Sequence, residues 1–504
     1  MCTKRDRMLL LLTAVLLVSG ASAAKILGVV MTDSYSHQVV YKPLWRELSL
    51  RGHQVTTITT HPLKDPKLVN LTEIDLSGIL TPAEQDQMMR NHVGIAQKNV
   101  VSELRNLFSI MSNGIDRMLD YGPIKKLIND KEVKFDLVVV EYLWPAPLAF
   151  AHRFNCPYIG MLLYPDNILP FGDKLSLWQR VASFVFEYGI VAYLGDLVQN
   201  DQKIVAKHFG DDYPPLGEIA NNISMLFVNA DPIFHHNRPL VPTVVQIGSG
   251  SHRSTPRPLP KKLQSTLDHA SDGFIYFSLG SNMKSEFLPA NTMEVLLSVF
   301  AELPYTVLWK FGEEIANKSD NVIVAKWLPQ EDVLRHPNCK LFITQCGLQS
   351  MDEAIYSHVP MVGMPVFGDQ FFNAKKIVNK GLGLELDYQR LEREHFKKTV
   401  LEVITNPRYR STVKQLAELA QDQPMTGTEK AVWWTEYVIR HKGARHLRSP
   451  LLDIPWYQYL LLDVIGVLLF GVSVTLYSMV VFVRWLIRLI RRRFYAISVK
   501  KKSS

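Results

Sequence analysis

Polar residues lie between two apolar runs in residues 342–370, which read FITQCGLQSMDEAIYSHVPMVGMPVFGDQ. The first run ends near Gly347, where the chain must turn, and a helix is expected to open at Gln349 and Ser350. A strand, a tight turn and a helix N-terminus in that order present free backbone N–H groups and the positive end of the helix dipole. The stretch therefore predicts a phosphate site beyond the carboxyl ends of buried strands.

A histidine lies in a comparable place near the N-terminus. His37 follows an apolar run at residues 25–31, expected to be a strand, and starts a helical pattern that extends to Arg51. Imidazole is suited to take a proton from a hydroxyl because its pKa lies near neutral pH. A lone histidine after a strand is more often structural than catalytic, so the role of His37 depends on its wider context.

Several other kinds of chemistry lack their sequence signals. The chain has no Asp-x-Asp metal motif, no Gly-x-Ser-x-Gly motif of serine hydrolases and no Gly-x-Gly-x-x-Gly after a strand. The formal charge of +8 comes from residues 484–504, which contain eight basic and no acidic residues, so the rest of the chain is about neutral. This distribution argues against a nucleic-acid-binding surface on a folded domain.

The body of the chain alternates strand and helix patterns, which predicts parallel sheets covered on both faces. Strands are expected at residues 25–31, 54–60, 135–140, 157–163, 274–278, 306–310, 322–326, 340–344 and 361–364. Residues 239–260 contain five prolines and two glycines, which indicates a linker between a first domain at 24–238 and a second at 261–445. Residues 175–197 form an amphipathic, aromatic-rich segment. We expect a core helix there, with a membrane-surface contact as the alternative.

The two ends predict a membrane protein. Residues 1–23 have basic residues, a short apolar run and Ala21-Ser22-Ala23, as in a secretory signal peptide. Residues 459–483 are long and apolar enough to cross a bilayer, and the basic tail at 484–504 is then cytosolic. The chain ends Lys501-Lys502-Ser503-Ser504, which resembles the di-lysine retrieval signal of endoplasmic reticulum proteins.

Cysteines and sequons fit a lumenal body without a disulfide framework. After removal of the signal peptide three cysteines remain, and we expect them to be free: Cys156, Cys339 and Cys346. Three asparagines head N-glycosylation sequons, and we expect one or two to be used: Asn70, Asn222 and Asn317.

Residues 342–370 also resemble the donor-binding signature of the UDP-glycosyltransferases. That signature has Thr-His-Gly-Gly or Thr-His-Cys-Gly at the end of a strand and closes on Asp-Gln. The matching positions here are Ser350, Glu353, Pro360, Pro365, Asp369 and Gln370. The histidine of the family is Gln345 in this chain, which resembles arthropod members. The resemblance implies a GT-B architecture: two Rossmann-like, doubly wound parallel-sheet domains facing a cleft, with the acceptor on the first and the UDP-sugar on the second.

The resemblance also implies a catalytic pair. The base of the family is a histidine in a Ser-His context before a helix and a Gly-His pair, which matches Ser36-His37 and Gly52-His53 here. An acidic residue, usually Asp, orients that histidine, and Glu141 occupies its position at the end of the strand at 135–140. The alternative for Glu141 is a cap on the following helix.

Donor contacts follow from the same resemblance. It implies that Ser281 contacts a phosphate and that Trp327 stacks on the uracil. It also implies that Gln330 contacts the nucleoside and Glu353 the ribose. Four further residues complete the diphosphate and sugar sites, namely Gly347, Gln349 and Ser350 at the phosphates and Gln345 as a neutral N–H donor nearby. Asp369 and Gln370 would hold sugar hydroxyls. Two alternatives stay open: Trp327 as a core residue, and Ser350 with Glu353 as a helix capping box.

Together these patterns predict an inverting UDP-glycosyltransferase, single-pass type I in the endoplasmic reticulum membrane with a lumenal body. It would transfer a hexose, favouring glucose, to a hydroxyl of a small lipophilic acceptor, a reaction type used in detoxification. We expect no metal and no cofactor, because the UDP-sugar is a co-substrate and backbone N–H groups can stabilise the diphosphate. Nucleic acid is not expected as a partner, and a homo-oligomer is left open. The alternative is a non-catalytic membrane protein that keeps the fold for ligand binding.

Overall fold

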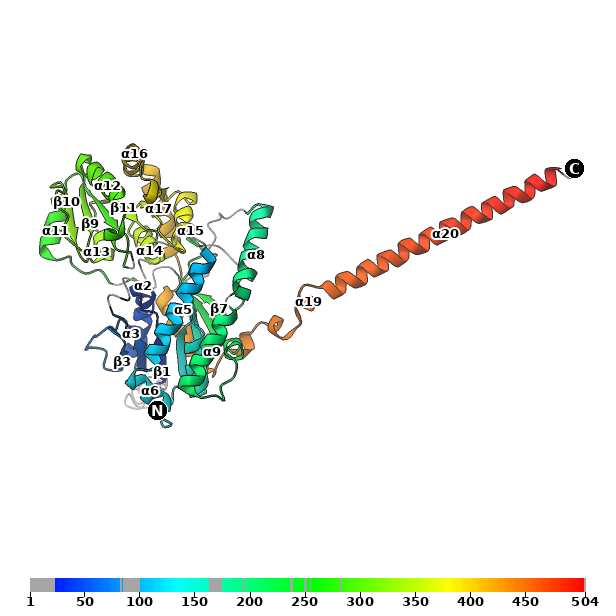
Figure 1. Cartoon of the computed structure of the whole chain (residues 1–504), viewed down its shortest axis with the longest axis horizontal. Coiled ribbons are helices and arrows are strands. Elements are labelled where there is room, and N and C mark those ends of the chain that lie inside the picture. Colours follow the sequence, from blue (N-terminus) through cyan, green and yellow to red (C-terminus); the bar gives the residue numbers. More distant parts are fainter. Residues whose placement is uncertain are drawn as a thin grey trace, which may run out of the picture. The chain divides into compact units, whose positions relative to one another are not determined.

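The computed structural model of this 504-residue chain has two units, Met1–His446 and Leu447–Ser504 (Figure 1). It describes residues 23–81, 84, 100–162, 175–193, 195–235, 239–248, 252–253, 255–281 and 283–502. The predicted signal peptide, apart from Ala23, lies outside the described residues, as do the last two residues of the predicted di-lysine signal.

The first sheet has seven strands, and all neighbouring pairs are parallel. Its order is β3 (Leu71–Asp75), β2 (Gln54–Thr59), β1 (Lys25–Val30), β4 (Leu137–Glu141), β5 (Tyr158–Leu162), β6 (Met225–Val228) and β7 (Val244–Gln246). The central strands are continuous apolar runs, because helices cover both faces of a parallel sheet. The four strands predicted for the first domain are confirmed, whereas β3, β6 and β7 were not predicted.

The helices of this half connect its strands. They are α2 (Tyr35–Val39), α3 (Lys42–Leu50), α5 (Val100–Leu119), α6 (Gly122–Asn129), α7 (Ala149–Phe154), α8 (Leu177–Tyr193), α9 (Gly195–Phe209) and α10 (Leu216–Asn221). The single helix predicted from residue 37 to residue 51 is divided into α2 and α3. Pro43 lies in the first turn of α3, where its missing N–H costs no intrahelical hydrogen bond, so the second helix begins there.

The second sheet has six parallel strands. Its order is β10 (Val322–Ala325), β9 (Thr306–Lys310), β8 (Phe274–Ser278), β11 (Cys339–Thr344), β12 (Met361–Gly363) and β13 (Gly383–Glu385). Its helices are α11 (Lys261–Asp268), α12 (Ala290–Glu302), α13 (Gln330–Leu334), α14 (Leu348–Tyr356), α15 (Gln370–Asn379), α16 (Arg393–Thr405), α17 (Pro407–Gln421) and α18 (Gly427–Arg440). The prediction of two α/β units with parallel sheets is confirmed.

Both sheets reverse their strand order once. In the first sheet, the chain goes from β1 outward to β3 and then returns to β4 on the other side of β1. In the second sheet, it goes from β8 outward to β10 and then returns to β11 on the other side of β8. The loops after these paired strands diverge at the carboxyl edge, and the resulting crevice is where doubly wound sheets bind ligands. The positions after β1, β4, β8 and β11 are therefore the places to look for function.

The boundary between the halves differs from the prediction. Strand β7 lies inside the segment expected as a linker at 239–260, and it pairs with β6 as the edge of the first sheet. The C-terminal helix α18, expected to belong to the second domain, packs against α3 of the first, where Arg51 and Glu436 form an ion pair of 3.2 Å. The proline content of residues 239–260 indicated a connection between the two sheets, but it did not reveal β7. An edge strand of three residues has too little pattern to be recognised in the sequence.

Helix α8 is not a core helix, so the favoured interpretation of residues 175–197 is wrong. Trp178 is 78% exposed, Phe184 61% and Tyr188 65%. The helix carries few charges, and six of its described apolar side chains are exposed: Leu177, Trp178, Val181, Phe184, Val185 and Tyr188. The alternative, a contact with a membrane surface, stays a prediction.

The second unit contains α19 (Trp456–Tyr459) and α20 (Leu462–Lys502). Within the described residues, one helical stretch is long and apolar enough to cross a membrane, Leu462–Arg493. The predicted span at 459–483 overlaps this stretch, and the basic tail continues the same helix. The three cysteines of the body are free, as predicted, with Cys339 and Cys346 buried.

Candidate active site

One cavity of about 530 Å³ is lined by residues that follow strands of both sheets. All of the predicted site residues lie on its wall: His37, Glu141, Ser281, Trp327, Gln330, Gln345, Gly347, Gln349, Ser350, Glu353, Asp369 and Gln370. The two walls touch directly, because the Gln349 side-chain amide donates a hydrogen bond of 3.2 Å to the backbone carbonyl of Ser36. Parallel strands bring residues that are far apart in sequence to one edge, and the strand reversals concentrate them there.

The first wall holds a histidine–carboxylate pair. His37 lies on α2 and Glu141 is the last residue of β4, the strand beside β1. Their Nδ1 and Oε1 atoms are 2.6 Å apart, and the Glu141 side chain is 3% exposed against 27% for His37. The extra methylene of glutamate therefore does not prevent the contact. Glu141 bonds to His37 and to the Thr32 hydroxyl, which disfavours the alternative of a helix cap.

This arrangement suits general base chemistry. With Nδ1–H donated to the carboxylate, the lone pair of Nε2 is the basic position of the imidazole. The carboxylate also stabilises the imidazolium that forms when the ring takes a proton. His37 lines the cavity, so a hydroxyl bound there is within the reach of its ring.

The second wall is built around the turn from β11 into α14. Cys346 adopts a φ of 67°, and Gly347 is the N-cap of α14. Gln345 is buried at 7% exposure beside Gly280, which follows β8 and has a φ of 81°. A Cβ on Gly280 would strain this left-handed backbone and would have to displace the Gln345 side-chain amide, so glycine is favoured at this point. Two strand-to-loop turns thus bring backbone groups together at the helix N-terminus, as an anion site requires.

A hydrogen-bonded cluster lies next to that turn. The amide nitrogen of Gln330 donates to Ser350 Oγ and to Glu353 Oε2, both at 2.9 Å, and the Tyr276 hydroxyl donates to Gln330 Oε1 at 3.2 Å. Ser350 lies inside α14 and not at its N-cap, and the helix has no side-chain cap bond. The capping-box alternative for Ser350 and Glu353 is therefore wrong, and both side chains are oriented by Gln330.

Trp327 is 58% exposed, so the alternative of a core residue is wrong as well. Lys310 Nζ lies 4.4 Å from the centroid of its ring, and the Tyr35 ring meets it edge-on with centroids 5.5 Å apart. An exposed indole on the wall of a cavity offers a flat surface on which a base can stack.

Asp369 and Gln370 lie between β12 and α15. The Asp369 carboxylate accepts a hydrogen bond of 2.9 Å from the side-chain amide of Asn373, and burial raises its pKa. Gln370 Oε1 accepts from the backbone N–H groups of Val366 and Phe367, which leaves its NH₂ group as the side chain's donor. These fixed polar groups can hold hydroxyls of a sugar.

Two cations on the cavity wall, Lys310 and Arg257, were missed from the sequence. Lys310 ends β9, and its Nζ donates a hydrogen bond of 2.7 Å to the carbonyl oxygen of Gly280. Burial lowers the pKa of Lys310 to about 8. Its position at the carboxyl end of a predicted strand was the available signal, since strand ends in one parallel sheet share an edge.

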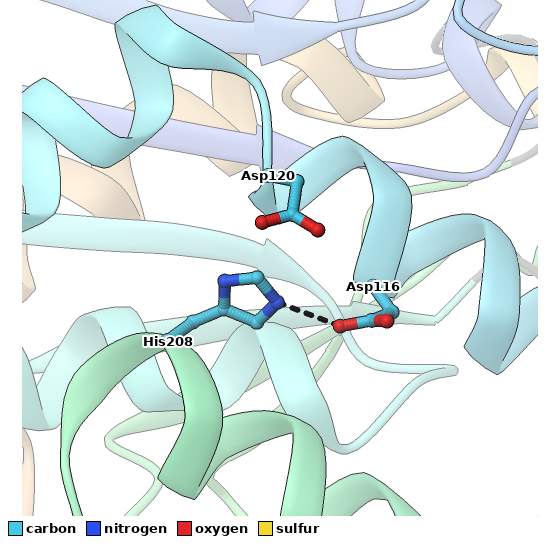
Figure 2. Close-up of side chains that lie close together, drawn as sticks. All are labelled: Asp116, Asp120 and His208. Carbon is cyan, nitrogen blue, oxygen red and sulfur yellow. Dashed lines mark hydrogen bonds and ion pairs between the residues drawn. The ribbon is translucent and has the colours of Figure 1, made fainter.

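A second polar cluster lies outside this cavity. Asp116, Asp120 and His208 come together between α5 and α9, and Figure 2 shows His208 Nε2 directed at Asp116, with 2.6 Å between the bonded atoms. Lys207 Nζ lies 2.8 Å from both Asp116 oxygens and 3.3 Å from Asp120. Because Lys207 and, at Asp120, Lys125 already pair with these carboxylates, we assign the cluster to ion pairing around the two helices.

The fold and the site define a class of protein. The structure resembles that of the glycotransferase of kitacinnamycin with a TM-score of 0.58 at 20% identity, over 82% of this chain and 99% of that one. Two doubly wound parallel sheets of this kind define the GT-B fold, which here carries a histidine–carboxylate pair on a cavity that the start of α14 also lines.

Sequence comparisons identify the family. Residues 161–495 match the family model described as "UDP-glucoronosyl and UDP-glucosyl transferase". UDP-glycosyltransferase UGT5 of Dactylopius coccus is 35% identical over 490 residues, 91% of each chain. Ecdysteroid UDP-glucosyltransferase of Mamestra brassicae nuclear polyhedrosis virus is 32% identical over 86% of this chain and 88% of its own. The chain belongs to the UDP-glucuronosyl and UDP-glucosyl transferase family, and the resemblance seen in residues 342–370 is confirmed.

Proposed function

We propose that this UDP-glycosyltransferase transfers glucose from UDP-glucose to a hydroxyl of a small lipophilic acceptor and inverts the anomeric carbon. The observation that carries this proposal is the pair of His37 and Glu141, 2.6 Å apart, on the cavity wall that faces the predicted donor residues. An intact pair and membership of the transferase family give no support to the alternative of a non-catalytic binding protein.

In this mechanism His37 removes the proton of the acceptor hydroxyl as its oxygen attacks the anomeric carbon. The bond between that carbon and the diphosphate oxygen breaks, and UDP leaves with the electron pair. Attack from the face opposite to the leaving group inverts the configuration. Glu141 stabilises the imidazolium until the proton is released to water.

The leaving diphosphate would be held by groups of the second wall. Backbone N–H groups at the start of α14, the Ser281 and Ser350 hydroxyls and the Gln345 amide are neutral donors there. Lys310, bonded to the carbonyl of Gly280 beside Ser281, adds a positive charge that the sequence did not reveal. Trp327 and Glu353 would take the uracil and the ribose.

Two lines support glucose as the donor sugar and a lipophilic acceptor. The viral relative named an ecdysteroid UDP-glucosyltransferase is 32% identical to this chain over 465 residues. The first wall of the cavity includes the apolar side chains Val39, Leu143 and Leu162 beside His37, which suits an apolar molecule that carries one hydroxyl.

The location proposed is the endoplasmic reticulum membrane, with the body in the lumen and one crossing. The apolar helix Leu462–Arg493 and the basic residues at its end support the crossing and its orientation. Asn222 and Asn317 are exposed and suit glycosylation, whereas Asn70 is half-buried. The amide nitrogens of Asn70 and Asn222 are both bonded to backbone carbonyls, those of Ser49 and Glu218.

The donor assignment has a direct test. Microsomes containing the full chain are incubated with labelled UDP-glucose or UDP-glucuronate and a panel of phenols, with His37→Ala microsomes as the blank. Transfer from UDP-glucose alone, or at much higher kcat/KM, is expected. Preference for UDP-glucuronate would overturn the donor assignment, and equal product from the His37→Ala microsomes would overturn the mechanism.

A further inference from the structure

The carboxylate of Glu141 has a partner on the side away from His37. Its Oε2 accepts a hydrogen bond of 2.5 Å from the Thr32 hydroxyl, and Thr32 Oγ1 in turn accepts one of 2.7 Å from the indole N–H of Trp144. All three residues are at most 5% exposed. We propose that Thr32 and Trp144 are positioning residues that orient Glu141, and through it the proposed base His37; this inference rests on the proposed function.

The chemistry of the donors and acceptors fixes the direction of each hydrogen bond from Trp144 through Thr32 to Glu141. An indole N–H can only donate, so the Thr32 oxygen must be the acceptor of the bond from Trp144. The single hydroxyl proton of Thr32 is then directed to Glu141 Oε2. With that oxygen occupied as an acceptor, Oε1 of the ionised carboxylate accepts Nδ1–H of His37. The carboxylate as acceptor of Nδ1–H leaves the lone pair of Nε2 free to take a proton, and Thr32 and Trp144 hold that carboxylate in place.

The surroundings hold Thr32 and Trp144 in place. The side-chain amide of Gln38 donates to the Thr32 carbonyl at 2.8 Å and to the Val30 carbonyl at 3.0 Å, so the backbone after β1 is fixed. The Trp144 ring meets Phe108 edge-on with centroids 5.1 Å apart. These contacts make the donors rigid, as positioning of a reactive side chain requires.

Glutamate makes such support necessary. The resembled family usually has aspartate at this position, and glutamate has one more rotatable bond, so its carboxylate can occupy more positions. A hydrogen bond from a fixed hydroxyl removes that freedom. The position of Thr32 two residues after β1, beside the end of β4, brings it to the carboxylate.

Four variants of the full membrane-bound chain test the proposal: Thr32→Val, Thr32→Ser, Trp144→Phe and Thr32→Val combined with Glu141→Gln. We expect Thr32→Val to lower kcat by about 10- to 100-fold with little change in the KM for UDP-glucose, because misplaced reacting groups cost about that much. Thr32→Ser keeps the hydroxyl and should restore most of the rate. Trp144→Phe should lower kcat by less, since the Thr32 hydroxyl remains.

The double variant separates positioning from packing. If Thr32 acts through the carboxylate, Thr32→Val should have little further effect on kcat once Glu141 is glutamine, since coupled residues are not additive. A wild-type kcat in Thr32→Val, equal losses in the Val and Ser variants, or the same fold-loss with and without Glu141→Gln would each overturn the proposal. Failure of the proposed function is seen separately, as normal turnover by His37→Ala.

Discussion

His37 is the residue on which the proposed chemistry depends. Replacing it with Ala removes the base, which is typically worth about 10²–10⁴-fold, so kcat should fall by that order. Calorimetry should show unchanged UDP affinity, because the predicted nucleotide contacts lie on the other wall. Glu141→Gln keeps a hydrogen-bond partner without the charge and should lose less rate than His37→Ala. A His37→Ala enzyme with near-normal turnover would contradict the assignment.

Gln345 occupies the position at which the family signature has histidine, and its contacts indicate which hydrogen bonds its side chain can make. Its Oε1 accepts from the Thr344 hydroxyl at 3.2 Å, while its Nε2 lies beside Gly280. The N–H₂ group is thus available as a neutral donor to a phosphate. A hydrogen bond to a charged group is worth about 1–3 kcal/mol, so Gln345→Leu should weaken UDP binding by roughly 5- to 150-fold. Gln345→His should be tolerated, and equal UDP affinities for Gln and Leu would show that the amide does not meet the nucleotide.

The lowered pKa of Lys310 predicts how UDP affinity depends on pH. Burial disfavours its charged form and lowers its pKa to about 8, so it loses its proton as the pH rises from 7 to 9. The protonated form attracts the diphosphate, so affinity should fall across this range, by at most about tenfold per pH unit for one coupled proton. Lys310→Met should bind UDP more weakly at pH 7 and lose this dependence. A wild-type affinity that is constant from pH 7 to 9 would remove Lys310 from the diphosphate site.

At the scale of elements, Gly280 closes the turn after β8 with a left-handed backbone. Gly280→Ala combines a left-handed φ of 81° with a Cβ that meets Gln345 Nε2, whereas Gly52, with a φ of 91°, has no atom within 4 Å of the added Cβ. Gly52→Ala is therefore a matched control that carries only the backbone strain, about 1–2 kcal/mol. Thermal unfolding should show a loss of stability in both variants, but only Gly280→Ala should weaken UDP binding. Equal UDP affinity in the two would mean that the turn does not shape the phosphate site.

The order of elements explains why His37 and Glu141, which are 104 positions apart, share one wall of the cavity. Strands β1 and β4 in one sheet, and β8 and β11 in the other, are neighbours at the reversal of strand order, so the side chains that follow them meet. The bond from Gln349 to the Ser36 carbonyl then joins the proposed base loop to the start of α14. Helix α18 adds a second connection, since it follows the second sheet in sequence but packs on α3.

At the scale of the whole molecule, the end of the chain predicts where the enzyme resides. Replacing Lys501 and Lys502 with Ser should leave the activity in detergent unchanged, because the catalytic residues lie in the other unit. It should release the protein to the Golgi or the cell surface if the pair is the retrieval signal. Microscopy of the tagged full chain measures the location of the protein, with Lys500→Ser as the control. An unchanged reticular pattern would place retention elsewhere in the chain.

The sequence by itself determined the two α/β units, most central strands, the donor motif at residues 342–370 and the pair His37 and Glu141. The strands and the motif are local features: buried parallel strands are continuous apolar runs, and a strand followed by a glycine turn and a helix has a recognisable pattern. The pairing of His37 with Glu141 was instead implied by the family resemblance. Only the tertiary structure decided which residues of one half meet those of the other. It also brought Lys310 to the carbonyl of Gly280 on the cavity wall, placed Thr32 and Trp144 beside Glu141 and left six of the described apolar side chains of α8 exposed. Short edge strands such as β7 and the burial of a helix face depend on long-range neighbours, and no local spacing of residues specifies them.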